Sequence, residues 1–260
     1  MKSIVAQILI LFAIMAVVAE FQLSACLAQQ PQTAAFREAN VLVVLIGGMD
    51  SDPTAAQIQN TARRHEGNSG MFRLQRDLKH DRIVSHYFNW NGTRAGKIQA
   101  KPTPGPTAII ETIRGHLQRH PQSRVIIVGN SWGGHTAWQV CQEIFDSPQP
   151  VAIDCVMFLD PSSAGRSAKS RPVRLPLNVA RSVNYHTRNL FGWRSWPNEE
   201  RMENIDLGDR KHGFLVDGGP AYDSAFNFEA HVAAEWDERL HADICKRIHD
   251  LIPKSDTSAN

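Results

Sequence analysis

The sequence has little of what marks several large classes of protein. Only four of its 260 residues are cysteines, and neither a Cys/His cluster at metal-ligand spacing nor an H-E-x-x-H segment occurs. A G-x-G-x-x-G fingerprint and a phosphate-binding loop are also missing. We therefore expect no metal and no nucleotide or other cofactor.

An excess of one charge is missing as well. The 28 Lys and Arg residues nearly balance the 26 Asp and Glu residues, for a formal net charge of +2, and the basic residues are scattered. No Lys/Arg run alternates with aromatic residues, so nothing favours nucleic acid as a partner. With 42% hydrophobic and 21% charged residues, the composition is that of an ordinary globular protein with one sizeable core.

The hydrophobic run from Ile8 to Ala19 follows the positive charge of Lys2. It is shorter than the roughly 20 residues that a membrane-spanning helix needs, and it has the length of a signal-peptide core. We expect residues 1–28 to be a signal peptide and the protein to be exported, periplasmic or secreted.

Two processing sites compete in this segment. Leu23-Ser24-Ala25-Cys26 resembles a bacterial lipobox, whose cleavage would leave a lipidated Cys26, whereas ordinary cleavage would follow Ala28. Glu20 and Gln22 interrupt the approach to the cysteine and favour ordinary cleavage. Membrane attachment is expected only if Cys26 carries lipid.

The remaining chain divides by composition. Residues 29–40 are a polar lead-in, residues 41–253 are the expected folded domain, and residues 254–260 are a tail expected to be disordered. Removal of the signal peptide leaves Cys141, Cys155 and Cys245. The sequence leaves two alternatives, a Cys141–Cys155 disulfide or three buried free thiols.

Continuous aliphatic runs predict strands that are buried on both faces of a parallel sheet. These runs lie within Val41–Ile46, Arg124–Val128 and Val151–Leu159, the last of which includes Val156-Met157-Phe158-Leu159. The segments 83–90 and 181–186 have the β-branched and aromatic content of further strands.

Apolar residues at helical spacing predict helices between these strands. One helix is expected within 53–80, one follows Pro106, one follows Ser131 and ends before Pro148, and the last runs from Glu235 to Ile252. Residues 198–235 hold no clear periodicity and are expected to form a long loop. The alternation of strand and helix predicts an α/β fold.

The segment Gly129-Asn130-Ser131-Trp132-Gly133 joins a predicted strand to a predicted helix. Glycines two residues before and after the serine permit a sharp turn that a Cβ would block. The turn would expose Ser131 at its tip, with the first amides of the helix directed at whatever the serine oxygen attacks. Ser131 is therefore a candidate nucleophile.

At this elbow the sequence resembles the α/β-hydrolase family of esterases and lipases, with Asn130 where many lipases carry His. The resemblance implies a mostly parallel central sheet with helices on both faces. It also implies an oxyanion hole formed by the N–H of Trp132 together with that of Met49 or Gly48, which follow the first predicted strand. Residues 162–180 are too few for a large lid domain.

The family's chain order is Ser, then Asp or Glu, then His on the loop before the final helix. His231 fits that place, with His212 and His186 as alternatives. His135, one turn after Ser131, is expected to be structural.

The acid is less constrained. Asp160 ends a predicted strand, and Leu159-Asp160-Pro161 resembles the acid-bearing turn of pancreatic-type lipases. Asp206 and Asp209, after the following strand, are alternatives.

These residues predict a serine hydrolase that cleaves carboxylic esters through a Ser-His-Asp triad and an acyl-enzyme. The expected substrate is a small-molecule or lipid ester, and aromatic residues at 191, 193 and 196 either line its pocket or pack the loop. An amidase or thioesterase on the same scaffold is the alternative, as is an inactive binding protein with this fold.

Overall fold

The computed structural model describes residues 41–48, 69–88, 106–162, 174–190, 192–193 and 199–253, which all belong to one compact unit, Ala39–Asn260. The predicted signal peptide with Cys26, the polar lead-in, Met49 and the tail lie outside the described residues. The domain boundaries and the expected export therefore stay predictions.

The centre of this unit is a six-stranded sheet in the order β2-β1-β3-β4-β5-β6, and every strand pair is parallel. The strands are β1 (Val41–Ile46), β2 (Ile83–Phe88), β3 (Arg124–Asn130), β4 (Cys155–Leu159), β5 (Ser182–His186) and β6 (Met202–Asp206). The predicted parallel sheet is confirmed.

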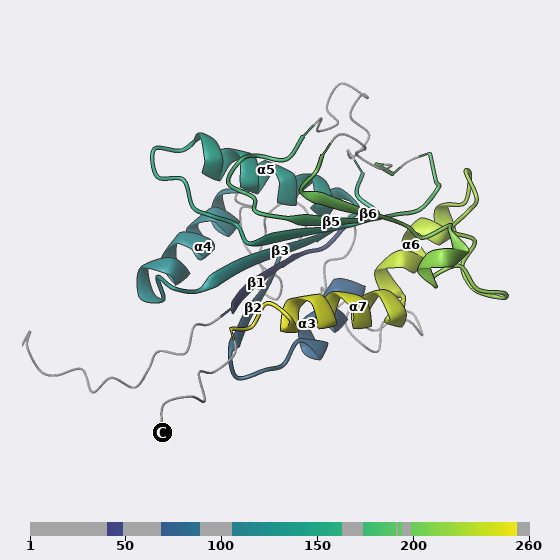
Figure 1. The fold of residues 1–260 in the computed structure, drawn as a ribbon, viewed down its shortest axis with the longest axis horizontal. Coiled ribbons are helices and arrows are strands. Elements are labelled where there is room, and N and C mark those ends of the chain that lie inside the picture. Colours follow the sequence, from purple (N-terminus) through teal and green to yellow (C-terminus); the bar gives the residue numbers. More distant parts are fainter. Residues whose placement is uncertain are drawn as a thin grey trace, which may run out of the picture. The chain divides into compact units, whose positions relative to one another are not determined.

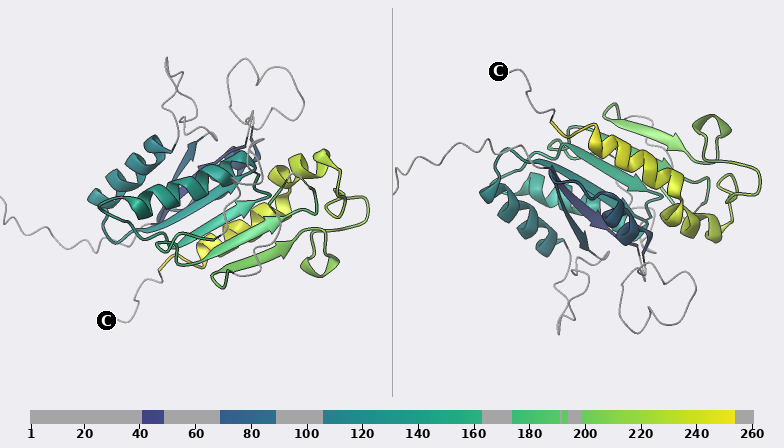
Figure 2. Two further views of the ribbon diagram at one scale, coloured as in Figure 1. Left: turned by 90° about the horizontal axis from the view of Figure 1, so that it is seen from above. Right: turned by 90° about the horizontal axis from the view of Figure 1, so that it is seen from below.

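Helices cover both faces of the sheet (Figures 1 and 2). Helices α4 (Thr107–Arg119) and α5 (Trp132–Asp146) pack on one face, and α3 (Gly70–Asp77), α6 (Phe228–Trp236) and α7 (Glu238–His249) pack on the other. This double cover explains why β1 is aliphatic at every position. Val41, Val43 and Leu45 enter one core, while Leu42, Val44 and Ile46 enter the other.

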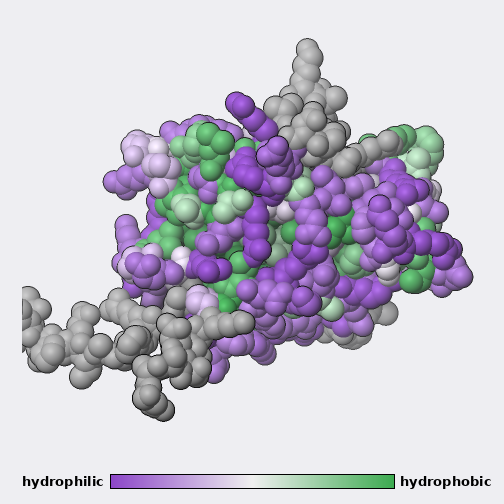
Figure 3. Space-filling view, in the orientation of Figure 1, coloured by the Kyte–Doolittle hydropathy of each residue, from purple (hydrophilic) through white to green (hydrophobic). Residues whose placement is uncertain are grey.

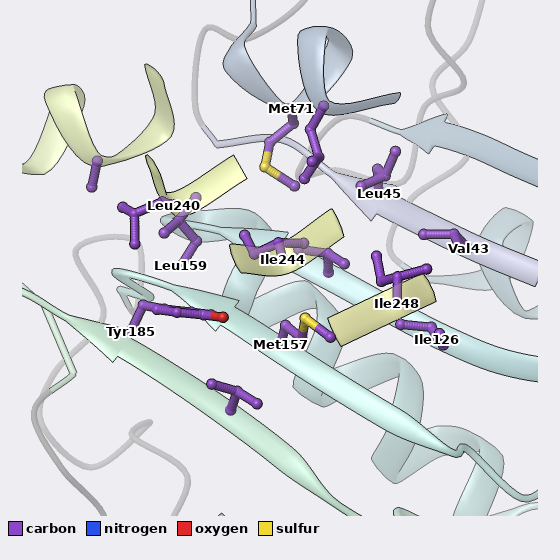
Figure 4. Packing of buried hydrophobic residues seen from close by; sticks show 14 of the residues in the cluster. Val43, Leu45, Met71, Ile126, Met157, Leu159, Tyr185, Leu240, Ile244 and Ile248 are labelled. Atoms are coloured by element: carbon purple, nitrogen blue, oxygen red, sulfur yellow. The ribbon is translucent and has the colours of Figure 1, made fainter. Parts of the chain in front are cut away.

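The core between the sheet and α7 shows how the last helix is held (Figure 4). Leu240, Ile244 and Ile248 lie one helical turn apart on α7, and each is fully buried. They face aliphatic side chains of β1 and β3 and the ring of Tyr185 from β5. Each such side chain contributes about 1.5–3 kcal/mol of hydrophobic stabilisation when it is buried, and together the three hold α7 against this face of the sheet.

The prediction of a long loop over residues 198–235 is wrong. This segment holds β6, the 3-10 helix η3 (Arg210–His212) and α6. Strand β6 lies at the sheet edge, where Met202 and Ile205 are buried but Glu203 is exposed, so it lacks the continuous apolar run of a central strand.

The predicted final helix from Glu235 to Ile252 is also wrong in extent. Helix α6 ends at Trp236, and Asp237 begins α7 by accepting a hydrogen bond from the Arg239 amide at 2.9 Å. An aspartate at this position satisfies an amide that lacks an intrahelical partner, which favours a new helix start. The chain thus turns between two helices.

The three cysteines within the described residues are free thiols. Cys141 lies in the core between the sheet and α4 and α5, and Cys155 lies in the core on the opposite face. The sheet separates the two sulfur atoms, so the structure has the free thiols and not the disulfide. Burial raises the pKa of both thiols, that of Cys155 to about 11, so both stay protonated at neutral pH.

Within the described part of the chain, no helix is long and apolar enough to cross a membrane. The described residues 174–181, which lead into β5, form turns and extended chain, and no large lid occurs there.

Candidate active site

Parallel strands end at one edge of the sheet, and three polar residues follow three adjacent strands there. Ser131 comes after β3, Asp160 after β4 and Thr187 after β5. The strand register aligns Asn130 with Leu159 and Leu159 with Tyr185, so the chain ends of β3, β4 and β5 lie side by side. This carboxyl edge is where open α/β sheets hold their ligands.

Ser131 occupies a sharp turn between β3 and α5. Its backbone has φ 49° and ψ −121°, a conformation that costs a non-glycine residue on the order of 1–3 kcal/mol. Close packing maintains it, since a Cβ on Gly133 would lie 2.3 Å from the Ile46 carbonyl oxygen. The predicted glycine is therefore required where α5 crosses the end of β1.

Hydrogen bonds fasten this turn to the end of β4. The Ser131 amide and the Asn130 side-chain amide both donate to the Leu159 carbonyl oxygen, at 3.0 and 3.1 Å. The Ser162 amide donates to the Ser131 carbonyl oxygen at 3.0 Å. The serine and the end of β4 are consequently held as one unit.

His231 is the fourth residue of α6, and its Nε2 lies 2.8 Å from Ser131 Oγ. The expectation that it sits on a loop is wrong, because the helix already begins at Phe228. The cap residue Asn227 accepts the Ala230 amide with its side chain at 3.2 Å. The imidazole is held in the first turn of a capped helix and is only 7% exposed.

Asp160 approaches the other ring nitrogen, with 2.6 Å between its Oδ2 and His231 Nδ1. The aspartate is fully buried and has φ 40°, and its amide donates to the Tyr185 carbonyl at 2.7 Å. A carboxylate beside Nδ1 keeps the proton on that nitrogen and leaves Nε2 to accept from the serine hydroxyl. The three side chains form one line of hydrogen bonds, from hydroxyl to imidazole to carboxylate.

The alternative residues lie in other contacts. Asp206 pairs with Arg188 at 3.0 Å and accepts the Gly208 amide, while Asp209 caps η3. His212 Nδ1 lies 2.9 Å from the Asp206 carbonyl oxygen, and His186 Nδ1 lies 3.4 Å from that of Thr187. Each serves the local structure after β5 and β6.

Two of the three residues predicted for an oxyanion hole are described. Trp132 is the first residue of α5, so its amide is at the positive end of the helix beside Ser131. Gly48 follows β1, and a Cβ there would lie 2.9 Å from Asn130 Oδ1 and 3.0 Å from Ser131 Cβ. The backbone at Gly48 is thus next to the serine, whereas Met49 is outside the described residues.

Sequence reasoning missed Thr187 and Ser162, which both lie at this edge. Thr187 donates to the Asp160 carboxylate from its amide at 2.9 Å and from its hydroxyl at 3.1 and 3.0 Å. Ser162 Oγ lies 3.5 Å from Ser131 Oγ. Their only sequence signal is a small hydroxyl residue just after a predicted strand.

The aromatic loop residue that the structure describes, Trp193, is 3% exposed and packs against His135 and Phe158. It is a packing residue, and the aromatic residues at 191 and 196 lie outside the described residues. His135 is buried between Trp138 and Trp193, which fits its expected structural role.

Among the described residues, no group of three or more His, Cys, Asp or Glu side chains is arranged to hold a metal ion. At the carboxyl edge His231 Nδ1 and Asp160 Oδ2 are 2.6 Å apart, within hydrogen-bonding distance of each other.

The sheet order, the helices on both faces and the serine elbow constitute the α/β-hydrolase fold. No protein-family model and no curated protein matches the chain. Among solved structures, it is similar to a YdeN-like hydrolase from Pectobacterium atrosepticum, with 15% identity, 83% of this chain and 94% of the other covered, and a TM-score of 0.45.

Two further solved structures are similar to the chain at lower identity. A cutinase-like protein from Cryptococcus shares 13% identity over 82% of this chain and 95% of its own, with a TM-score of 0.37. An acetylxylan esterase shares 10% identity over 83% and 99%, with a TM-score of 0.39. The assignment of chemistry therefore rests on the side chains of this chain.

Proposed function

We propose that the protein is a serine hydrolase that cleaves carboxylic esters through an acyl-enzyme. The observation that carries the proposal is the line of hydrogen bonds from Ser131 Oγ to His231 Nε2 at 2.8 Å and from His231 Nδ1 to Asp160 Oδ2 at 2.6 Å. A serine hydroxyl is a weak nucleophile at neutral pH, and an oriented imidazole is what activates it.

In the proposed reaction, Ser131 Oγ attacks the ester carbonyl while His231 Nε2 takes the hydroxyl proton. The tetrahedral intermediate collapses, and the alcohol leaves with that proton. Water then attacks the acyl carbonyl while His231 takes a proton from it. The second tetrahedral intermediate collapses, the acid leaves, and the proton returns to Ser131 Oγ. Asp160 orients the imidazole and stabilises its charged form without being consumed.

The developing oxyanion would be bound by the amide of Trp132 and by that of Gly48 or Met49. Trp132 begins α5, and Gly48 lies against Ser131 Cβ, so both backbone segments border the serine. Each such donor contributes about 3 kcal/mol to lowering the barrier in comparable sites.

A fluorophosphonate probe tests the proposed nucleophile. The wild-type protein is expected to be labelled at Ser131, and the Ser131→Ala variant is expected to stay unlabelled while folded. Ser162→Ala is the matched control, since it removes a hydroxyl 3.5 Å away and is expected to keep the label. Folded wild-type protein that is not labelled would refute the enzymatic function.

Apolar side chains around the site favour an ester with an apolar acyl group. Leu190, Phe226 and Phe228 are 52%, 80% and 58% exposed, and grouped exposed hydrophobic side chains are typical of a binding surface. The Leu190 amide donates to the Ala225 carbonyl at 3.0 Å, and the ring centroid of Phe228 lies 5.6 Å from that of His231. Figure 3 shows hydrophobic surface among hydrophilic surface at the right-hand end of the molecule, where α6 lies in Figure 1.

Nitrophenyl esters of increasing acyl length test this substrate class. We expect kcat/KM to rise with acyl length in the wild type and the rise to be reduced in Phe228→Ala. Phe145→Ala, which changes a 36% exposed phenylalanine near the end of α5, is the control that should leave the series unchanged. Amides and thioesters of the same acyl group show whether esters are the preferred class.

We further propose that the chain is exported with its first 28 residues removed. The support is the apolar run after Lys2, which has the length of a signal-peptide core. The intact mass of the exported protein tests this and separates cleavage before Gln29 from lipidation at Cys26.

A further inference from the structure

Two polar side chains just after β5 are buried although the proposed reaction does not use them. Thr187 is 1% exposed and Asn189 is fully buried. A buried hydroxyl or amide costs free energy unless its hydrogen bonds are made, so the partners of these groups reveal what the segment holds in place.

Thr187 is bound to the acid of the site. Its amide donates to Asp160 Oδ1 at 2.9 Å, and its hydroxyl reaches both carboxylate oxygens, at 3.1 and 3.0 Å. The Asn189 amide donates to the same hydroxyl oxygen at 3.2 Å. Because a carboxylate only accepts hydrogen bonds, the Thr187 hydroxyl directs its proton at Asp160, and this contact helps to fix the rotation of the carboxylate.

Asn189 is bound to the element that carries the base. Its side-chain nitrogen donates to the Asn227 carbonyl oxygen at 2.7 Å. Asn227 is the cap residue of α6, and His231 follows in the first turn of that helix. The Asn189 side chain therefore fixes the start of α6 and, through it, the position of the imidazole.

The contacts close a ring. From Asp160 they pass through Thr187 and Asn189 to Asn227, along the first turn of α6 to His231, and back to Asp160 at 2.6 Å. The acid and the base are 71 residues apart in sequence, yet one three-residue segment contacts both the carboxylate and the helix of the imidazole.

We propose that Thr187 and Asn189 are positioning residues that hold Asp160 and His231 in register for proton transfer. This inference rests on the proposed function. Neither residue would touch the substrate, so both are expected to affect kcat through the orientation of the imidazole and to leave substrate binding nearly unchanged.

Thr187→Val tests the hydroxyl, because it replaces the hydroxyl with a methyl group of similar size and keeps the backbone amide. With a nitrophenyl ester, kcat per folded molecule is expected to fall about 10–100-fold, as for loss of a hydrogen bond to a charged group, while KM changes less than about threefold. Thr187→Ser restores the donor and is expected to keep kcat within about threefold of the wild type.

Thr112→Val is the matched control, since the Thr112 hydroxyl donates to the Ala108 carbonyl at 2.8 Å within α4, away from the site. Its kcat and KM should equal those of the wild type. Asn189→Ala, which removes the tie to Asn227, should repeat the loss in kcat with unchanged KM, and it decides the question if Thr187→Val does not fold.

The proposal is overturned if Thr187→Val has the same kcat per folded molecule as the wild type. It is also overturned if kcat falls in Thr187→Val but is not restored in Thr187→Ser. Folded protein is counted by circular dichroism and thermal melting, so a mere loss of stability is not scored as a loss of kcat. Labelling of the wild type by the fluorophosphonate probe is measured first. If the wild type is not labelled, the proposed function is refuted. If the wild type is labelled and Thr187→Val keeps full turnover, only the positioning role is refuted.

Discussion

At the carboxyl ends of β3, β4 and β5 the polar side chains are buried and hydrogen-bonded to one another, whereas at the amino ends of β4, β5 and β6 they form ion pairs around an open pocket. The pocket has a volume of about 700 Å³ and is lined from both the sheet and α7. Its cations are paired locally, Arg247 with Glu203 at 2.6 Å and Asp243 at 2.8 Å.

The two ends of the sheet differ in backbone strain. The described non-glycine residues with positive φ, Ser131 and Asp160, both lie at the carboxyl edge, where each is hydrogen-bonded to His231. Strained backbone and buried polar groups persist only where the surroundings hold them, and they gather at functional sites. The pocket therefore lies between the sheet and α7, and the strained, hydrogen-bonded carboxyl edge is the place of the proposed reaction.

The largest expected effect is that of His231→Gln. Removal of the general base should lower kcat on the order of 10⁵–10⁶-fold, because the serine proton then has no acceptor in the proposed reaction. The assay is turnover of a nitrophenyl ester. His116→Gln makes the same replacement at the amino end of the sheet, and a comparable loss there would break the distinction between the two ends.

Gly48→Ala is expected to have the next largest effect on kcat. The added Cβ would lie 2.9 Å from Asn130 Oδ1 and 3.0 Å from Ser131 Cβ, so both residues must shift by a few tenths of an ångström, and kcat should fall by up to about 10²-fold. Gly115→Ala is the control within α4, where a Cβ would lie 3.7 Å from Arg119 Nη1, an ordinary van der Waals contact. That change should stabilise the protein by about 0.5–1 kcal/mol and leave kcat unchanged. Equal turnover in the two variants would contradict the close approach of Gly48 to the nucleophile.

The same contrast explains what the sequence could predict. Strand β1 is aliphatic throughout, and β3 and β4 each contain an apolar run, because helices cover both faces of the sheet, so composition alone identifies these strands. The elbow is a local pattern, since glycines two residues on either side of Ser131 meet a steric requirement within the same turn.

What escaped prediction depends on distant partners or on the sheet edge. Thr187 and Asn189 bond to residues 27 and 38 positions away, and no local pattern encodes such contacts. Strand β6 buries only Met202 and Ile205, one in each core, and its other three residues are polar, so no apolar run reveals it. The starts of α6 and α7 were readable in principle, because Asn227 and Asp237 are cap residues.

A further test concerns the pH dependence of stability at the amino end, where His116 is buried beside Ser123 at 2.9 Å. Burial, aided by the nearby His120, lowers the pKa of His116 from 6.5 to about 4. Below pH 6.5 the unfolded chain binds a proton that the folded chain does not, so the stability contributed here is complete above pH 6.5 and is lost as the pH falls toward 4.

His116→Gln cannot take up that proton. The loss of unfolding free energy between pH 7 and pH 5 should therefore be smaller in the variant by about 1–2 kcal/mol, measured by urea unfolding at both pH values. Burial also lowers the pKa values of His186 and His241, so the variant should still lose part of its unfolding free energy between pH 7 and pH 5. An unchanged slope would show that His116 is protonated in the folded state.

The smallest effect is expected from Arg247→Met in the pocket. Arg247 bonds Glu203 and Asp243 and lies 5.9 Å from the ring centre of Tyr185, but its side chain is 27% exposed, so water screens these pairs. Methionine keeps the apolar stem, and the free energy of unfolding should fall by only about 1 kcal/mol. Because Tyr185 lies on β5, whose end leads into Thr187, a large loss of kcat in this variant would mean that the two ends of the sheet are coupled through that strand. Unchanged kcat, with the small loss of stability seen by urea unfolding, would mean that the ion pairs secure α7 to the sheet and take no part in the reaction.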